Sequence, residues 1–212
     1  MSATDIIRIA CAMDARGFAP SKSGNVSQRT DKGFLITPTG LPYAGLKPGD
    51  LAHLDLEGRI IQGTHEPSSE WRFHASIYRA RPEIGAIVHN HSPRATALSC
   101  ARKPLPAFHY MVAIAGGHDI RCAEYATFGT QELADHAVAA LQDRKACLLA
   151  NHGVIALGVS LDAAWSVAQE VENLASEYLD ILAARLKPVI LSAAEMKRVS
   201  SKFAHYSKGG PD

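Results

Sequence analysis

The sequence predicts an α/β fold: a single-domain layered fold over residues 1–212, with a central mixed or mostly antiparallel β-sheet covered by helices. Three observations predict it. Short apolar, partly β-branched runs bounded by turn residues indicate strands. Longer stretches with apolar residues three or four positions apart indicate helices. The two kinds of segment follow one another without the strict alternation that favours an all-parallel sheet.

The N-terminal part predicts a helix followed by two hairpins. Residues 4–16 carry apolar side chains at helical spacing, and Gly17 is a suitable stop. Short strands then come in pairs whose turns contain glycine, Asp31-Lys32-Gly33 in the first and Glu57-Gly58 in the second. Residues 37–42 contain two prolines and a glycine and should form a loop. The four strands are expected at residues 26–29, 34–37, 51–55 and 59–61.

The rest of the chain mixes helices with buried strands. A helix is expected wherever a capping residue precedes apolar residues at helical spacing, as at Ser68, Thr130 and Ser160. Ser192-Ala193-Ala194-Glu195 is a capping box that opens a last helix. The first three of these helices are expected at residues 68–81, 130–141 and 161–185. Apolar runs predict strands at residues 86–91, 106–114, 147–150 and 154–157.

The composition is that of one globular domain with a full core, since 47% of the 212 residues are hydrophobic and 20% are charged. A formal charge of +1 without a basic block argues against a nucleic-acid partner. No apolar run approaches the length of a membrane span, and the first residues lack the pattern of a signal peptide. Four scattered cysteines are typical of reduced thiols. We therefore expect a cytoplasmic protein with no membrane partner.

Histidines stand at the ends of two predicted strands. His89 and His91 close the run Ala86-Ile87-Val88-His89-Asn90-His91, and His152 follows the strand at 147–150. Residues two apart on a strand point to the same face, so His89 and His91 can hold one ion without distorting the backbone. A histidine from a second strand end would complete a Zn²⁺ site with one open position, as in catalytic zinc centres. The alternative, histidines that are only hydrogen-bonded, stays open.

A carboxylate accompanies these histidines. Glu70 is expected in the first turn of the 68–81 helix, where the helix dipole favours a negative charge. It is either an ordinary helix-start residue or a general base beside the metal, because loss of solvent in a cleft tunes a carboxylate toward proton transfer. His74 lies one turn further on the same helix face and is expected to orient or pack behind the site.

Three small polar turns could bind an anion. Ser68 and Ser69 lie at an expected helix N-terminus, whose free amides favour phosphate. Ser23-Gly24-Asn25 and Thr37-Pro38-Thr39-Gly40 offer further amides and hydroxyls. Together the turns could cradle a phosphate without any lysine, although each alone is compatible with ordinary turn chemistry. Lys22-Ser23 is not a Walker A motif, because the required glycines are missing.

Seven segments in order resemble the class II aldolase/adducin family over nearly the whole chain. They are residues 23–27, 35–40, 67–74, 88–91, 106–111, 125–130 and 151–153. Such a series is far more specific than His-x-His alone. One departure is Asn151, where the closest members are expected to have histidine. If the backbone were extended there, Asn151 would point away from the face of its neighbour His152.

The resemblance implies a zinc-dependent aldehyde-lyase of carbohydrate metabolism with one Zn²⁺ per subunit. Such an enzyme reversibly cleaves a ketose 1-phosphate, L-fuculose 1-phosphate or a similar sugar, to dihydroxyacetone phosphate and an aldehyde such as L-lactaldehyde. Members of this type are cyclic homotetramers with active sites between subunits. The resemblance implies that His89, His91 and His152 bind the metal, with Glu70 near or on it. Glu70, together with Tyr110 of a neighbouring subunit, would transfer protons, and Phe128 and Tyr206 would shape the aldehyde side. The residues implied to bind the phosphate are Gly24, Asn25, Thr39, Gly40, Ser68 and Ser69.

Other activities of the same fold stay open. They are a sugar-phosphate 4-epimerase, a decarboxylase of phosphorylated 3-oxo acids and a methylthioribulose-1-phosphate dehydratase. Ser68-Ser69-Glu70-Trp71 and His89-Asn90-His91 differ from the Ser-Ser-Asp-Thr and His-Thr-His expected of an epimerase. A non-enzymatic adducin-like interaction module is the least favoured, because the histidines and Glu70 are all present.

Overall fold

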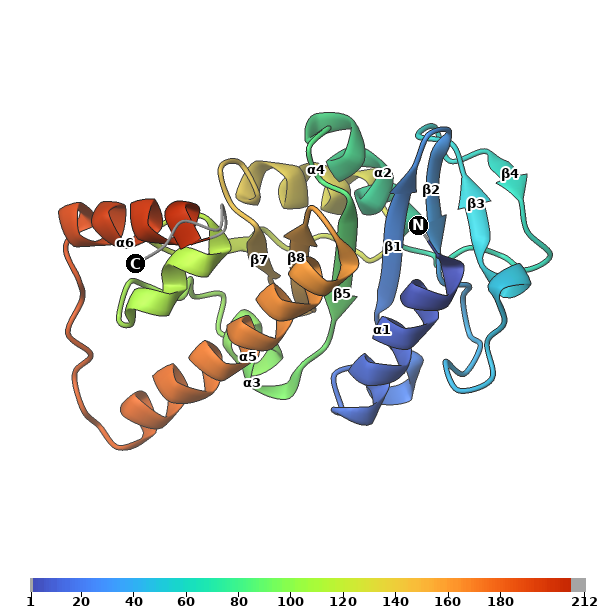
Figure 1. Ribbon diagram of the computed structural model, residues 1–212. Helices are drawn as coiled ribbons and strands as arrows, with labels where there is room; N and C mark the ends of the chain where they lie inside the picture. Colours follow the sequence, from blue (N-terminus) through green and yellow to red (C-terminus); the bar gives the residue numbers. More distant parts are fainter. Residues whose placement is uncertain (1, 207–212) are drawn as a thin grey trace.

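One sheet organises the protein. The computed structural model in Figure 1 describes residues 2–206, and the side chains of residues 2–203. Among these residues eight strands form a single sheet in the order β4-β3-β2-β1-β5-β8-β7-β6. Every neighbouring pair is antiparallel except β6 and β7, which are parallel. The strands are β1 Asn25–Thr30, β2 Gly33–Ile36, β3 Ala52–Leu54, β4 Ile60–Gln62, β5 Ala86–Asn90, β6 Arg121–Ala123, β7 Ala146–Leu149 and β8 Gly153–Gly158.

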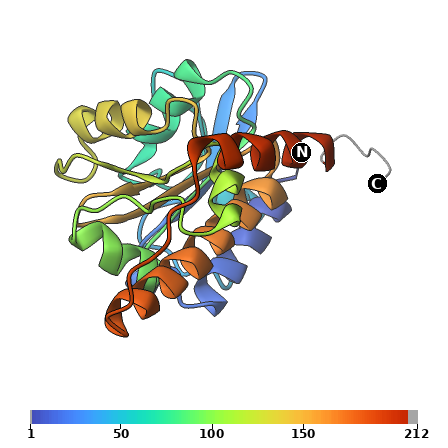
Figure 2. The ribbon, with the colours of Figure 1, turned by 90° about the vertical axis from the view of Figure 1, so that its left-hand side faces the viewer.

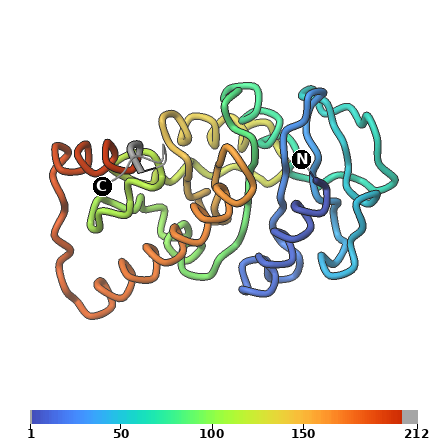
Figure 3. Tube along the Cα trace, in the orientation of Figure 1, coloured from blue at the N-terminus to red at the C-terminus, as the bar shows by residue number. Residues whose placement is uncertain are grey.

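Helices cover both faces of this sheet, as Figures 1 and 2 show. One face carries α1, α3 and α5, and the other carries α2 and α4. Figure 3 follows the chain from α5 through residues 184–192 to α6, which lies beyond β7. The helices are α1 Ala3–Ala15, α2 Trp71–Ala80, α3 Pro93–Cys100, α4 Gln131–Ala140, α5 Leu161–Ala183 and α6 Ala193–Tyr206, with 3₁₀ turns η1 Pro20–Lys22, η2 Pro48–Asp50 and η3 Tyr110–Ala115.

The central strands are apolar on both faces because helices cover both. Successive strand residues point to opposite faces, so Val88 packs in the cluster under α1 and α5, whereas Ile87 packs in the cluster under α2 and α4. Val154 and Ile155 of β8 divide in the same way. This two-sided burial confirms the predicted layered α/β fold with a mixed, mostly antiparallel sheet.

Local capping chemistry places most of the predicted helices. Thr130 accepts a hydrogen bond from the backbone N–H of Leu133 at 3.2 Å, and Ser160 caps α5 in the same way. The Ser192 hydroxyl accepts from the N–H of Glu195 at 3.2 Å, which is one half of the predicted capping box. No described helix is both long and apolar enough to cross a membrane.

The prediction of a strand over residues 106–114 is wrong. The chain there forms η3, and the His109 side chain caps it by accepting from the N–H of Met111 at 3.2 Å. The β-forming residues of this run do not alternate between buried and exposed, because Val112 and Ala113 are both buried in the core beneath the helices. Packing therefore overrides the local strand propensity.

Two elements were not predicted, and one helix begins later than expected. The N–H groups of Arg94 and Ala95, at the start of α3, donate to the carboxylate of Glu172 in α5. A cap supplied from so far along the chain leaves no local sequence signal. Strand β6 is only three residues long. The helix expected over 68–81 begins at Trp71, so Ser68 and Ser69 lie before it.

The start of β2 generates a stability prediction. Gly33 has φ +150°, and a Cβ atom there would lie 1.9 Å from the carbonyl oxygen of Leu54 on β3. Gly33→Ala should therefore lower the free energy of unfolding by about 2 kcal/mol or more, as measured by urea denaturation. Gly49→Ala is the control, since a Cβ there has no neighbour within 4 Å. Equal denaturation midpoints for both variants would contradict this close approach.

Candidate functional site

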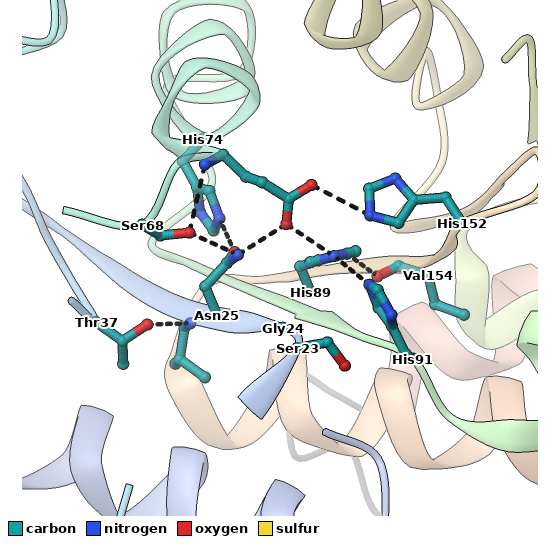
Figure 4. A network of polar contacts seen from close by, with 12 residues as sticks. Ser23, Gly24, Asn25, Thr37, Ser68, His74, His89, His91, His152 and Val154 are labelled. Atoms are coloured by element: carbon teal, nitrogen blue, oxygen red, sulfur yellow. Dashed lines mark hydrogen bonds and ion pairs between the residues drawn. The ribbon is translucent and has the colours of Figure 1, made fainter. Parts of the chain in front are cut away.

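Three histidines meet where β5 ends and β8 begins. His89 lies in β5, His91 directly follows this strand, and His152 lies in the turn that leads into β8. The antiparallel pairing of Asn90 with Val154 brings these segments together. One ring nitrogen from each histidine lies within 4.8 Å of the other two, and the Nε2 atoms of His89 and His91 are 3.1 Å apart. Figure 4 shows the three rings facing a common point.

The hydrogen bonding of His89 turns its second ring nitrogen toward that point. His89 Nδ1 donates to the Val154 carbonyl at 2.9 Å, so Nε2 is the ring nitrogen that faces the other histidines. Burial, helped by the neighbouring His89 and His152, lowers the pKa of His91 to about 3. The imidazole of His91 is therefore neutral over the physiological range, as a metal ligand must be.

Glu70 stands beside the histidines. It is the N-cap residue of α2 and not part of the first helical turn, and its side chain makes no capping bond. Its Oε2 lies 3.1 Å from His89 Nε2, and its Oε1 lies 3.2 Å from His152 Nε2. Burial opposes ionisation of this carboxyl, but His89 and His152 outweigh it and hold the pKa of Glu70 well below its usual range.

This arrangement fits a metal ion. Oε1 of Glu70 is buried and receives no hydrogen bond from any described group, since its contact with His152 lacks the geometry of one. Three imidazole nitrogens and an unsatisfied carboxylate oxygen in one place are the donor set of a divalent transition metal. The residues present could therefore hold such an ion.

A buried hydrogen-bond chain holds Glu70 in place. Asn25 Nδ2 donates to Oε2 of Glu70 at 3.0 Å and to the hydroxyl of Ser68 at 2.9 Å. Asn25 Oδ1 in turn accepts from Nε2 of His74, whose Nδ1 faces the hydroxyl of Ser27 at 2.7 Å. His74 is fully buried. It therefore orients Asn25 from behind the site, in agreement with its expected supporting role.

A cavity of about 320 Å³ opens beside these groups. It is lined by all six residues expected to bind phosphate, Gly24, Asn25, Thr39, Gly40, Ser68 and Ser69, and by Glu70, His91, His152 and Phe128. It is also lined by Ser23 and Pro38, which belong to the predicted anion-binding turns, and by four residues that were not predicted as site residues, Lys22, Tyr125, Ala126 and Asn151. The only sequence signal for the latter group is that each lies next to, or within three positions of, a predicted site residue. The turns could cradle a phosphate without any lysine, but Lys22 also lines the cavity.

The structure does not bring every predicted residue to the cavity. Tyr110 begins η3, is 48% exposed and does not line the cavity of its own chain. Tyr206 ends α6, and its side chain lies outside the described residues. Asn151 is not extended but has φ +53°, and its Oδ1 accepts from Nε of Arg102 at 2.7 Å. This left-handed turn keeps Asn151 at the cavity rather than on the opposite face.

The fold and the site together define an α/β protein in which three histidines that could hold a metal ion lie beside a cavity. Residues 4–179 match the family model described as "Class II Aldolase and Adducin N-terminal domain", and the chain belongs to this family. The resemblance predicted from the sequence is thus confirmed.

Relatives and solved structures agree with this assignment. The chain is 53% identical to a 5-methylthioribulose-1-phosphate/5-deoxyribulose-1-phosphate aldolase of Rhodospirillum rubrum, over 90% of this chain and 85% of the relative. It is 47% identical to an L-fuculose phosphate aldolase of Escherichia coli O157:H7, over 96% and 94%. A solved L-fuculose 1-phosphate aldolase superposes with a TM-score of 0.91 at 38% identity, covering 95% of both chains. The chain is a lyase-type enzyme of the class II aldolase family.

The burial of His74 generates a pH prediction. Burial, helped by nearby His89, lowers the pKa of His74 to about 3, whereas the unfolded chain takes up the proton near the ordinary value of about 6.5. Stability should thus fall as the pH falls from about 6.5 toward 3. Between about pH 7 and about pH 5, His74 should account for a loss of about 2 kcal/mol in the free energy of unfolding.

Urea denaturation of chelator-treated protein at the two pH values tests this prediction. His74→Gln should show a smaller pH-dependent loss than the wild type. His118→Gln, which removes an exposed histidine, should retain the wild-type loss. An identical pH dependence in all three proteins would show that His74 does not stay neutral in the folded state.

Proposed function

We propose that this protein is a zinc-dependent aldolase that reversibly cleaves a ketose 1-phosphate to dihydroxyacetone phosphate and an aldehyde. The observation that carries this proposal is the shared cavity: His91 and His152 of the histidine cluster, the buried carboxylate of Glu70 and a set of small polar turns line one space, and His89 lies directly behind the two histidines. A metal ion held by the histidines would suit a ketone and its neighbouring hydroxyl, and the turns would suit a phosphate. A ketose 1-phosphate has both groups at one end.

The phosphate would bind among the turns. Thr39, Ser68 and Ser69 offer hydroxyls, and Gly24 and Gly40, which have no side chain, line the cavity with their backbone. The backbone N–H groups of Thr39 and Ser68 already donate to the carbonyls of Glu66 and Thr37. The side-chain amide of Asn25 already donates to Ser68 and Glu70, so its share in phosphate binding would come through its backbone. Holding an unreactive phosphate would orient the reacting carbons.

His89, His91 and His152 would hold one Zn²⁺ per subunit, with Glu70 beside it. When bound, the ion supplies a Lewis acid that stabilises negative charge developing on the ketone oxygen, a contribution of several kcal/mol in such enzymes. The neutral imidazole of His91, the three ring nitrogens that face one point and the unsatisfied Oε1 of Glu70 support this assignment.

Glu70 would move the proton at C3, the carbon that becomes the nucleophile in the synthetic direction. In the synthetic direction the ionised Glu70 would remove a proton from C3, the C3–C4 bond would form, and the C4 oxygen would take up a proton. Cleavage is the reverse: the C4 hydroxyl loses its proton, the C3–C4 bond breaks, and C3 gains a proton through Glu70. Proton exchange with solvent returns Glu70 and Tyr110 to their starting states. The hydrogen bond from Asn25 and the buried chain behind it fix the carboxylate for this transfer.

Tyr110 would accept the proton of the C4 hydroxyl in a neighbouring subunit. Its 48% exposure and its position outside its own cavity support a role across an interface. This assignment requires a homo-oligomer, and we propose a tetramer with active sites between subunits.

Phe128 and Tyr206 would shape the aldehyde side. We further propose that residues 1–212 form one domain that works in the cytoplasm, where its four free thiols stay reduced.

The natural ketose is the finer question. The sugars in the names of the relatives share the phosphate-bearing C1, the C2 ketone and the C3 hydroxyl, and they differ beyond C4. The metal centre and the phosphate turns meet only the shared part. Substrate choice would therefore depend on the aldehyde side, where discrimination of one methylene is worth about 1–3 kcal/mol.

Release of dihydroxyacetone phosphate from L-fuculose 1-phosphate and from 5-deoxyribulose 1-phosphate tests the proposal. We expect release by zinc-loaded protein, loss after chelation, and recovery when Zn²⁺ is returned. The faster of the two substrates would indicate the natural aldehyde. No release of dihydroxyacetone phosphate from either sugar by protein of verified zinc content would contradict the proposed reaction.

Glu70→Gln separates proton transfer from binding. The amide cannot accept a proton, so kcat should fall by about 10²–10⁴-fold while the Kd of dihydroxyacetone phosphate changes by less than about threefold. Zinc content should be measured alongside, because Glu70 contacts two histidines. Glu66→Gln, which neutralises an exposed carboxylate four positions earlier, is the control. Equal losses of binding and turnover would count against the proposed base.

A further inference from the structure

Lys22 carries a fixed positive charge into the cavity. Among the described residues that line this space it is the only lysine or arginine. The remaining groups around the proposed phosphate position are neutral amides and hydroxyls. A doubly charged phosphate therefore has one cationic group available to it in this chain.

The side chain of Lys22 is aimed at the turns that would bind phosphate. Its Nζ donates a hydrogen bond to the carbonyl oxygen of Gly40 at 3.1 Å, and Gly40 and its neighbour Thr39 line the cavity. An ammonium group has three protons. One of them holds the Gly40 carbonyl, and two stay available to an oxyanion beside it.

The backbone that presents Lys22 is strained. Ser21 and Lys22 have φ +55° and +64°, two consecutive left-handed residues of which neither is glycine. The left-handed conformation is unfavourable for any residue that has a Cβ atom. Two hydrogen bonds maintain it, from the N–H of Lys22 to Ala19 and from the N–H of Ser23 to Pro20, each 3.0 Å long. Such strain persists where a ligand site requires it.

We infer that Lys22 is a specificity-determining residue whose ammonium group binds the phosphate of the substrate and makes the enzyme select phosphorylated over unphosphorylated ketoses. This inference rests on the proposed function. Lys22 acts as a point charge and does not replace the amide-rich turns, because its tether to Gly40 keeps it at the edge of the Thr39-Gly40 turn.

Lys22→Met tests the inference, since it keeps an unbranched side chain and removes the charge. Calorimetric titration of zinc-loaded protein with inorganic phosphate should show a Kd raised about tenfold, the usual effect of losing a hydrogen bond to a charged group. KM for the ketose phosphate should rise similarly, while kcat should change by less than about threefold. The dependence of KM on salt between about 20 and 200 mM KCl should weaken. Lys22→Arg should restore most of the affinity.

Lys32→Met is the matched control. Lys32 lies in the turn between β1 and β2. This turn follows the far end of β1, whereas Asn25 begins the strand at the cavity. The variant therefore loses the same charge at a position away from the cavity. Its phosphate affinity should equal that of the wild type. Equal phosphate affinity in Lys22→Met and Lys32→Met would overturn the inference. So would a lower melting temperature of Lys22→Met with unchanged phosphate affinity, since Lys22 would then only tether Gly40.

Phosphate titration needs no turnover, so the two proposals can fail separately. If wild-type protein binds phosphate through Lys22 but releases no dihydroxyacetone phosphate, the proposed reaction is wrong and the anion site stands. If it releases dihydroxyacetone phosphate and Lys22→Met matches the wild type in phosphate affinity, the reaction stands and the inference about Lys22 is wrong.

Discussion

The antiparallel pairing of β5 with both β1 and β8 is the constraint on which the site depends. It sets the end of β5 beside the start of each neighbour, so that Asn25 pairs with His89 and Asn90 pairs with Val154. Groups more than sixty positions apart in the sequence thereby share one corner of the sheet. Gly153 is needed there, because a Cβ atom would lie 2.5 Å from the carbonyl oxygen of Asn90. A shift of either register by one residue would turn His89 toward the opposite layer.

A second constraint acts on the polar groups buried in that corner. The chain of contacts from Tyr78 through Ser27, His74 and Asn25 to Glu70 satisfies each member in turn. Satisfied networks of this kind are rigid, because any rotation leaves a buried polar group without a partner. Within this series of five side chains, Oε1 of Glu70, at the cavity end, is the atom left without a hydrogen bond. The network therefore fixes the position of this carboxylate oxygen through the packing of α2 against the sheet.

Much of this structure could be predicted from local sequence. The pairs of strands around Gly33, Glu57-Gly58 and His152, and the long helix after Ser160, follow from turn residues, caps and periodicity. The secondary-structure predictions that failed concern segments whose conformation depends on residues distant in the sequence. Helix α3 is capped by Glu172, and η3 is held by helices that follow it in the chain. The histidines and Glu70 could be recognised by residue type and order, whereas Lys22 acquires its meaning only when the fold places it beside Gly40.

The two sides of the cavity are built from different kinds of structure. The histidine side rests on buried strand ends, where His89 is fully enclosed and any change disturbs the core. Tyr125 and Phe128 on the other side lie in an irregular segment and are 52% and 65% exposed. Residues in such segments accumulate substitutions far more freely than core residues do. Substitutions can therefore change the proposed aldehyde side while the histidine corner is kept. The product of a duplicated gene of this type can thus change its substrate specificity while it keeps the same reaction.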